Sequence, residues 1–307
     1  MSVAEAGRPA ASRLDGRVAL AFGASPSINA GIVLALASEG ATVACVDKNE
    51  AFAGACAEDA RALGAKALAL TASVDDEAQV RQAVERVVGE FGGIDILVNG
   101  VAIESWHGLL DTTLEELRTH LNVILGGAFL ATQLCAASMI EQGRRGCVIN
   151  LLSTEAHQGR PGNIAYGVAK AALGHFTKCA AMELAEHGIR VNSLTPTGTD
   201  PAEGRDRVGR WGLTWAPNSP PRRPGFTSGD SGVPLGHRPS PSDYGRAAVY
   251  LASDDARMVT GFDLRVDGGV ISRYWRFNPG AQFAAPAASA AAPGDVPGDV
   301  PGEGKNS

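Results

Sequence analysis

A tyrosine and a lysine one helical turn apart, Tyr166 and Lys170, form the pair in this sequence best suited to moving a proton. They fall in a predicted helix, residues 164–187, where positions i and i+4 share one face. A nearby ammonium stabilises a phenolate and lowers the pKa of tyrosine from about 10 toward neutral pH. The pair therefore predicts a general acid or base. Taken alone, the spacing is common by chance and is typical of a solvated helix pair.

Two further polar residues fall where they could assist such a proton transfer. Ser153 follows a predicted strand at 146–152, and its hydroxyl could hydrogen-bond and orient a substrate oxygen. Asn122 lies inside a predicted helix at 114–140, where a buried amide needs a hydrogen-bond partner. With Tyr166 and Lys170, these residues indicate acid–base chemistry on a hydroxyl or carbonyl group.

A glycine and an aspartate near the N-terminus predict a dinucleotide site. Gly23 closes a predicted strand at 17–22 and opens a helix, whose free backbone N–H groups can bind a pyrophosphate. Asp47 ends the second strand, where a carboxylate accepts hydrogen bonds from both ribose hydroxyls and repels a 2′-phosphate. The spacing therefore favours NAD(H) over NADP(H), although Lys48 follows directly and argues slightly the other way. Gly23 alone would fit an ordinary turn.

These residues need a scaffold, and the hydrophobic pattern predicts one. Short apolar runs alternate with segments of helical period, which indicates parallel strands joined by right-handed crossovers. We therefore expect a Rossmann-like α/β fold, a doubly wound parallel sheet in a single domain at 15–280. The expected strands are 17–22, 42–46, 67–71, 94–98, 146–152, 190–194 and 263–266, and the expected helices are 31–39, 51–63, 76–91, 114–140, 164–187 and 243–252.

Three segments break this pattern. Residues 1–14 predict a flexible N-terminal arm, and the Ala/Pro/Gly-rich residues 281–307 predict a disordered tail, because neither can bury enough apolar area. Residues 197–242 are rich in proline and glycine and follow the sixth strand. We expect them to form a substrate lid with little regular structure, in which Trp211, Trp215 and Phe226 supply apolar contacts. The alternative is a disordered surface insertion.

Composition excludes several classes of partner. The chain has 307 residues, a net charge of -6 and a pI near 5.6, so no basic field attracts nucleic acid or anionic lipid. Its five cysteines lack metal-ligand spacing, so we expect no metal site and no disulfide framework, only reduced thiols. We find neither a signal peptide nor an apolar run long enough to span a membrane. The sequence thus predicts a cytoplasmic enzyme acting on a small molecule.

The chain resembles the short-chain dehydrogenase/reductase family over about residues 15–270. Tyr166, Lys170 and Ser153 match its catalytic motif, and Asn122 in the run 122–126 (Asn-Val-Ile-Leu-Gly) matches its helix asparagine. The run 99–102 (Asn-Gly-Val-Ala) fits its Asn-Asn-Ala-Gly motif. The motifs that the family has later in its sequence are matched here by residues 189–196, 251–254, 260–261 and 266–269.

This resemblance implies roles for the residues. Tyr166 would be the acid/base, Lys170 would lower its pKa and bind ribose, Ser153 would polarise the carbonyl, and Asn122 would hold a water that relays protons to Lys170. The implied reaction moves a hydride between a secondary alcohol and its ketone. The expected cofactor contacts are Gly23, Ser25, Ser27, Ile28, Asp47, Ser73, Val74, Asn99, Lys170, Pro196, Thr197 and Thr199.

The sequence also departs from the family. Its Gly-x-x-x-Gly-x-Gly run keeps only Gly23, because Ser27 and Asn29 replace the later glycines. Ser73 stands where the family has aspartate, and Thr197 where it has glycine. These changes indicate a reshaped cofactor turn, similar to the looser loops of the enoyl-thioester reductase branch, which spaces its tyrosine and lysine differently.

Substrate contacts are expected from Trp106, Glu155, His157 and Trp211, which favours a bulky cyclic or aromatic substrate with some polar groups. For His157 a packing role is the alternative, and Glu104 and Glu155 could be rim carboxylates. The family usually forms tetramers through two long helices, so we expect a homo-oligomer, a tetramer or dimer, through 114–140 and 164–187. Three other functions stay open: a 3-oxoacyl-thioester reductase, an isomerase or lyase, and a non-catalytic NAD-binding module.

Overall fold

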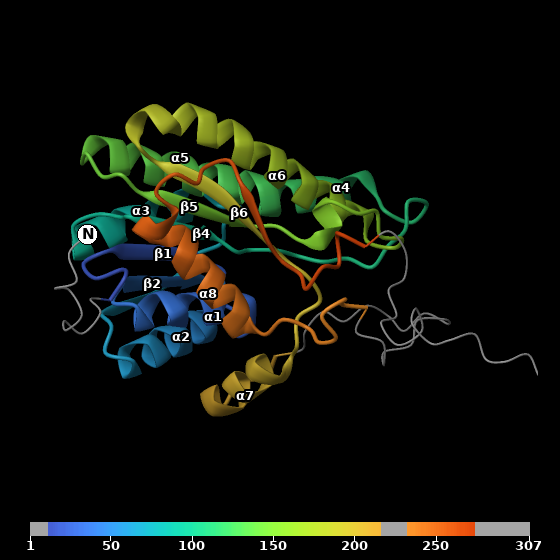
Figure 1. Ribbon diagram of the computed structural model, residues 1–307, viewed down its shortest axis with the longest axis horizontal. Helices are drawn as coiled ribbons and strands as arrows, with labels where there is room; N and C mark the ends of the chain where they lie inside the picture. Colours follow the sequence, from blue (N-terminus) through green and yellow to red (C-terminus); the bar gives the residue numbers. More distant parts are fainter. Residues whose placement is uncertain (1–11, 216–231, 274–307) are drawn as a thin grey trace, which may run out of the picture.

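A single parallel sheet of seven strands forms the centre of the protein, in a computed structural model that describes residues 12–215 and 232–273 (Figure 1). The strand order is β3-β2-β1-β4-β5-β6-β7. The strands are β1 Val18–Phe22, β2 Thr42–Asp47, β3 Ala67–Thr71, β4 Ile96–Asn99, β5 Cys147–Leu151, β6 Arg190–Pro196 and β7 Asp263–Val266. The prediction of a doubly wound sheet in one domain is confirmed.

Helices cover both faces of this sheet. The α-helices are α1 Ile28–Ser38, α2 Glu50–Ala62, α3 Glu77–Phe91, α4 Leu114–His120, α5 Gly127–Glu141, α6 Ile164–Leu184, α7 Ala202–Trp211 and α8 Pro241–Ala252. One core layer joins α1, α2 and α8 to the sheet, and the other joins α3, α5 and α6 (Figure 1). The central strands β1, β4 and β5 are buried along their whole length, and they are apolar apart from Asn99 in β4 and Asn150 in β5.

The order in which successive strands join the parallel sheet reverses between β1 and β4, and this reversal predicts where a ligand binds. β1 pairs with β2 on one side and with β4 on the other. In open α/β sheets the loops leaving two such strands separate, and a crevice opens at their carboxyl ends. The first residues of that crevice are Gly23 after β1 and Gly100 after β4.

Two expectations about regular structure are wrong. Residues 202–211 of the expected lid form α7, a regular helix, whereas sequence reasoning predicted little structure there. The long helix expected at 114–140 contains a π-helical turn, Leu121–Gly126, between α4 and α5. The helix α1 also begins at Ile28, earlier than its expected start.

The outer segments are only partly described. Phe226 and the rest of 216–231 lie outside the described residues, as do the tail 281–307 and residues 1–11 of the arm. Residues 12–14 belong to the folded domain, because Leu14 is fully buried and its N–H donates to the carbonyl of Glu39 at 2.9 Å. The ordered domain therefore begins slightly before residue 15.

One continuous helical stretch, Leu114–Glu141, is long and apolar enough to cross a membrane by length and composition, with a mean hydropathy of 1.8. In the structure it packs against α3, α6 and the sheet, and 44% of its most apolar window is buried. Packing within the protein therefore explains much of its apolar character. The rest forms an exposed apolar face.

Candidate active site

A cleft of about 510 Å³ opens at the carboxyl ends of the strands, where the sheet topology predicts a ligand site. Its walls bring together residues that are far apart in the sequence, from the β1–α1 loop to α6. The expected site residues that line it are Gly23, Ser25, Ser27, Ile28, Asp47, Ser73, Val74, Tyr166, Lys170 and Pro196. Tyr166 and Lys170, the predicted acid/base pair, thus share one cavity with Asp47, the predicted ribose ligand.

The loop between β1 and α1 presents free backbone donors to this cleft. Gly23 has a φ of 91°, in the left-handed region that favours glycine, so the chain turns sharply after β1. The loop's own turn bonds use other amides, so the N–H groups of Ser27, Ile28 and Asn29 have no acceptor among the described residues. Free amides at the start of a helix suit a pyrophosphate.

Asn29 explains how this loop works without its second and third glycines. Its side chain is buried, and its Nδ2 donates to the carbonyl of Gly100 at 2.8 Å. A Cβ on Gly100 would overlap the Asn29 amide, and a Cβ on Gly23 would lie 2.9 Å from its Nδ2. The Asn29 side chain therefore holds the β1 and β4 loops together and does not point at phosphate.

The opposite end of the cleft suits an adenosine. Asp47 lies at the end of β2, where its Oδ1 accepts from the N–H of Asn49 at 2.9 Å. Burial raises the pKa of the Asp47 carboxyl, and the bond from Asn49 opposes that rise. Phe52 lines the cleft beside Asp47, while Ser73 and Val74 line it after β3. An apolar ring and a carboxylate side by side can bind a base and its ribose.

The catalytic pair is buried in the other half of the cleft. Tyr166 and Lys170 are 8% and 2% exposed on α6, and the Lys170 Nζ lies 5.7 Å from the centre of the Tyr166 ring. The Nζ donates to the carbonyl of Leu151 at the end of β5, at 2.6 Å. This bond fixes the ammonium beneath the cleft floor.

Burial dominates the electrostatics of this pair. It raises the pKa of the Tyr166 phenol above its usual range, while a hydrogen bond with Ser153 opposes the shift and the carboxyls of Glu104 and Glu155 add to it. Burial also lowers the pKa of Lys170 to about 8, against a smaller opposing effect of Glu104. The net shift of the Tyr166 pKa in the protein alone is therefore upward, opposite to the expected lowering, because desolvation is the largest cause.

Ser153 lies where β5 passes into the next loop. It is 9% exposed, and its Oγ accepts from the N–H of Glu155 at 3.2 Å, capping the short helix Thr154–Ala156. That bond directs one lone pair of the Oγ into the loop and leaves its proton available. Ser153 also lies close enough to Tyr166 to hydrogen-bond it, so the two hydroxyls are neighbours at this end of the cleft.

A polar cluster surrounds these hydroxyls. The Glu155 carboxylate accepts from Arg160 Nη1 at 2.7 Å and from Asn163 Nδ2 at 3.0 Å, and the Arg160 guanidinium lies 4.8 Å from the Trp106 ring centre. Within the described residues, Trp106 Nε1 and Asn163 Oδ1 are buried without a partner. The pKa of Glu104 is raised by burial first and then by Glu155. Neither carboxylate is a solvated rim group, which corrects that expectation.

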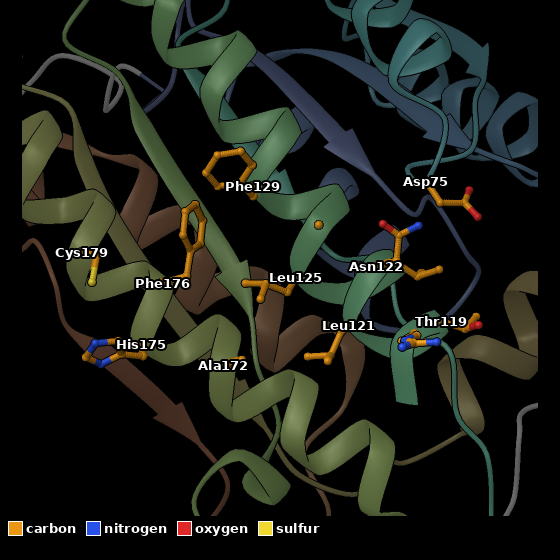
Figure 2. A pocket seen from close by; sticks show the side chains of 13 residues that line it. Asp75, Thr119, Leu121, Asn122, Leu125, Phe129, Ala172, His175, Phe176 and Cys179 are labelled. Atoms are coloured by element: carbon orange, nitrogen blue, oxygen red, sulfur yellow. The ribbon is translucent and has the colours of Figure 1, made fainter. Parts of the chain in front are cut away.

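Asn122 is not part of this site. Its side chain is exposed and lines a separate groove with Asp75 and Thr119, on the outer face of the helix (Figure 2). The helix residue that packs against Tyr166 is Ile124, which is 1% exposed. The cause is the π-helical turn, whose wider winding changes which side chains face inward. The Asn122 side chain therefore does not line the cleft, and the water relay through Asn122 stays a prediction.

Two expected cofactor contacts are also placed elsewhere. The Asn99 side chain is buried and donates to Asn150 Oδ1 at 2.8 Å and to Thr132 Oγ1 at 3.1 Å, so it ties β4 to β5 and α5. The Thr199 hydroxyl lies 3.4 Å from the Tyr244 hydroxyl and donates to the carbonyl of Thr197 at 3.2 Å. Their polar groups serve the packing around the cleft, because neighbouring buried polar groups need them as partners.

Two expected substrate contacts are wrong as well. His157 Nε2 lies 3.0 Å from Asp263 Oδ2 and 3.4 Å from Thr195 Oγ1, so the ring joins its loop to β6 and β7. Trp211 donates from Nε1 to Asp59 at 3.0 Å and packs on Phe52, at the adenosine end of the cleft. The packing role considered for His157 is the one observed.

A second hollow, of about 980 Å³, lies on the outer face of α4, α5 and α6. Leu121, Leu125, Phe129 and Phe176 give it an apolar floor, and His175 lies at its edge (Figure 2). It is larger than the cleft, but it lacks an acid/base pair, and its position fits an interface better than a reaction site.

Comparisons with known proteins agree with this geometry. The sequence profile of a family described as Enoyl-(Acyl carrier protein) reductase matches residues 23–271. The chain is 33% identical over 261 residues to the 3-oxoacyl-(acyl-carrier-protein) reductase FabG of Thermotoga maritima, covering 84% of this chain and 99% of the relative. It is 33% identical over 257 residues to the D-threitol dehydrogenase of Mycolicibacterium smegmatis, covering 84% and 94%. A solved short-chain type dehydrogenase/reductase from Mycobacterium marinum has a TM-score of 0.73 at 32% identity, covering 85% and 97%.

Proposed function

The chain belongs to the short-chain dehydrogenase/reductase family of oxidoreductases, and from that premise we propose that it uses NAD(H) to interconvert a secondary alcohol and its ketone. The observation that carries the proposal is a single cleft whose two ends hold different chemistry. Tyr166 and Lys170 line one end, with Ser153 beside Tyr166, and the half-buried Asp47 lines the other.

The residues present fit a bound dinucleotide. The free amides of Ser27 and Ile28 would hold its pyrophosphate, Asp47 its adenosine ribose and Lys170 its second ribose. When bound, the oxidised cofactor supplies a hydride acceptor and a positive charge beside the phenol. That charge would oppose the rise in the Tyr166 pKa caused by burial.

The protein's own groups then handle the proton. Ser153 donates a hydrogen bond to the substrate oxygen and holds it against the Tyr166 hydroxyl. Tyr166 accepts the hydroxyl proton during oxidation and returns it during reduction. Lys170 stabilises the phenolate while it is charged, which the pKa of about 8 allows at neutral pH.

Asp47 supports NAD(H) as the cofactor. An ionised carboxylate at the end of β2 accepts from ribose hydroxyls and repels a 2′-phosphate. Its partial burial strengthens that repulsion, because the local dielectric is lower than in water. The neighbouring Lys48 is exposed and acts mainly through solvent.

The polar cluster supports a cyclic substrate that carries a second polar group. Trp106 offers a flat apolar surface, while its Nε1 and the Asn163 Oδ1 lack partners among the described residues. Both atoms are enclosed by protein in this structure, so a hydroxylated ring would reach them only after the side chains around them rearrange. Trp211 does not support an aromatic substrate, because it packs on Phe52 at the end of the cleft proposed for the adenosine.

A 3-oxoacyl-thioester reductase is the second candidate. The Thermotoga relative, which bears that name, favours it. The carboxylate of Asp47 argues against it, because such reductases usually prefer the phosphorylated cofactor. The Mycolicibacterium relative is named for a polyol, D-threitol, and favours an alcohol dehydrogenase.

The test follows NADH absorbance with cyclohexanol, cyclohexane-1,2-diol and a 3-oxoacyl thioester. We expect net NADH formation from the diol, and we expect Tyr166→Phe to lose nearly all turnover while it still binds NADH. A Tyr166→Phe protein that keeps most of its rate would refute the assigned acid/base. NADH binding without net turnover of any substrate would favour an isomerase or a binding module.

We also propose that the protein is a homo-oligomer, joined through the outer groove of α4, α5 and α6. Phe129, which lines this groove, is 50% exposed, which is unusual for a large apolar side chain. Light scattering should give a dimer or tetramer, and Phe129→Glu should dissociate it. A monomeric wild type would contradict the proposal.

A cytoplasmic location is the last part of the proposal. All five cysteines are free thiols, and four of them are buried. Free thiols in this number are typical of a reducing compartment. Localising the tagged full chain by cell fractionation tests this.

A further inference from the structure

A buried arginine from α7 reaches the loop that replaces the family's glycine run. Arg207 is 6% exposed, and its Nη1 donates to the carbonyl of Pro26 and, at 3.4 Å, to that of Ser27. Burying a guanidinium costs free energy unless it is paired, and among the described residues the only carboxylate within 4 Å of it is Glu203, at 3.9 Å. Packing alone does not explain why a charged side chain is buried at this position.

The geometry of the peptide bond links the hydrogen bonds of Arg207 to the orientation of the loop amides. In a trans peptide the C=O of one residue and the N–H of the next point in opposite directions. The described peptides are all trans, so drawing the carbonyls of Pro26 and Ser27 toward Arg207 turns the N–H groups of Ser27 and Ile28 away from it. Those two residues line the cleft, and their amides are free.

We propose that Arg207 is a positioning residue for the cofactor pyrophosphate. It sets the orientation of the Ser27 and Ile28 amides that glycines set elsewhere in the family, and its charge lies behind the loop, where it attracts an anion. The inference rests on the proposed binding of a dinucleotide, and it makes α7 part of the cofactor site.

The helix that carries Arg207 is held independently of it. The Glu203 carboxylate accepts from the Ser242 N–H at 3.2 Å and from its hydroxyl at 2.8 Å, which ties α7 to α8. Trp211 donates to Asp59 on α2 at the other end of the helix. Replacing Arg207 should therefore release the loop and leave α7 in place.

The experiment measures the Kd for NADH by fluorescence titration, together with KM for NAD and kcat. We expect Arg207→Met to raise the Kd about tenfold or more and to leave kcat at saturating NAD within about twofold. Arg207→Lys should recover part of the affinity, because an ammonium can still donate to one carbonyl. Arg210→Met is the matched control, since that side chain is on the same helix, pairs with Asp59 at 3.4 Å and should not change the Kd.

Far-UV circular dichroism and the melting temperature of each variant accompany the titrations. A folded Arg207→Met protein with unchanged Kd would overturn the inference, and so would an equal loss in Arg210→Met. If Arg207→Met does not fold, the Kd for NADH of Arg207→Lys is compared with that of the wild type. An unchanged Kd in Arg207→Lys would then overturn the inference. Because titration needs no turnover, a wild type that binds NADH but oxidises nothing refutes only the proposed function.

Discussion

Lys170 should make the stability of this protein rise with pH in a range where most proteins lose stability. Its ammonium is almost fully buried, and burial lowers its pKa from 10.5 to about 8. Between these two values the unfolded chain binds more protons than the folded one, so the free energy of unfolding increases as pH rises. Below about pH 8 both states are protonated, and the folded state bears the full cost of a buried charge.

The size of the effect follows from the same two values. Each unit of pKa difference corresponds to about 1.4 kcal/mol, so the full effect is about 3 kcal/mol, of which about 2 kcal/mol falls between pH 7 and 10. Other groups titrate in this range, so the wild type alone does not isolate Lys170. The difference between the wild type and Lys170→Met does.

The assay is urea unfolding at pH 7, 8, 9 and 10, at one fixed protein concentration because the protein is proposed to be an oligomer. We expect the stability of Lys170→Met relative to the wild type to fall by about 2 kcal/mol from pH 7 to pH 10. Lys178→Met, an exposed position on the same helix, should show no such trend. A difference between the wild type and Lys170→Met that stays constant across this range would refute the reasoning, as would an identical trend in Lys178→Met.

Three other predictions test the corrected site. Asn122→Ala should leave kcat/KM within about twofold of the wild type, because the side chain lies outside the cleft. Loss of a proton-relay group would lower kcat/KM about a hundredfold, and steady-state kinetics at the pH optimum distinguishes the two outcomes. Asp47→Ser should shift the NAD/NADP ratio of kcat/KM by about tenfold or more toward NADP, and an unchanged ratio would remove Asp47 from the ribose site. Asn99→Ala should cost about 2 kcal/mol in urea unfolding, because it leaves Asn150 Oδ1 without its donor, while the Kd for NADH stays the same. A large rise in the Kd for NADH would instead indicate that Asn99 contacts the cofactor.

Sequence reasoning predicted the features that depend on short-range pattern. The buried strands are mostly apolar, and the residues at or just after their ends could be named in advance, such as Gly23 after β1 and Asp47 at the end of β2. The pair Tyr166 and Lys170 needs only helical spacing to share one face. These features were predictable because the sheet topology brings strand ends to one edge.

The errors have a different origin. No local signal in 114–140 reveals the π-helical turn, so Asn122 and Ile124 could not be assigned to their faces. His157 was assigned to the substrate because it follows Ser153, but Asp263, far along the chain, binds its ring. The role of Arg207 was missed because it depends on contact with Pro26 and Ser27, which are distant in sequence. Tertiary contacts decided the last two cases, and local helix geometry decided the first.

The pairing of β1 with β4 has a consequence for how the chain folds during synthesis. Ala19 pairs with Ile96, so the central strands cannot join until the ribosome has released the whole segment between them. Non-local pairing of this kind slows folding, because the chain loses the entropy of loop closure before the stabilising contacts form. In the meantime the apolar strands β1 and β2 are exposed to aggregation, and a growing polypeptide of this length is a natural client for a chaperone.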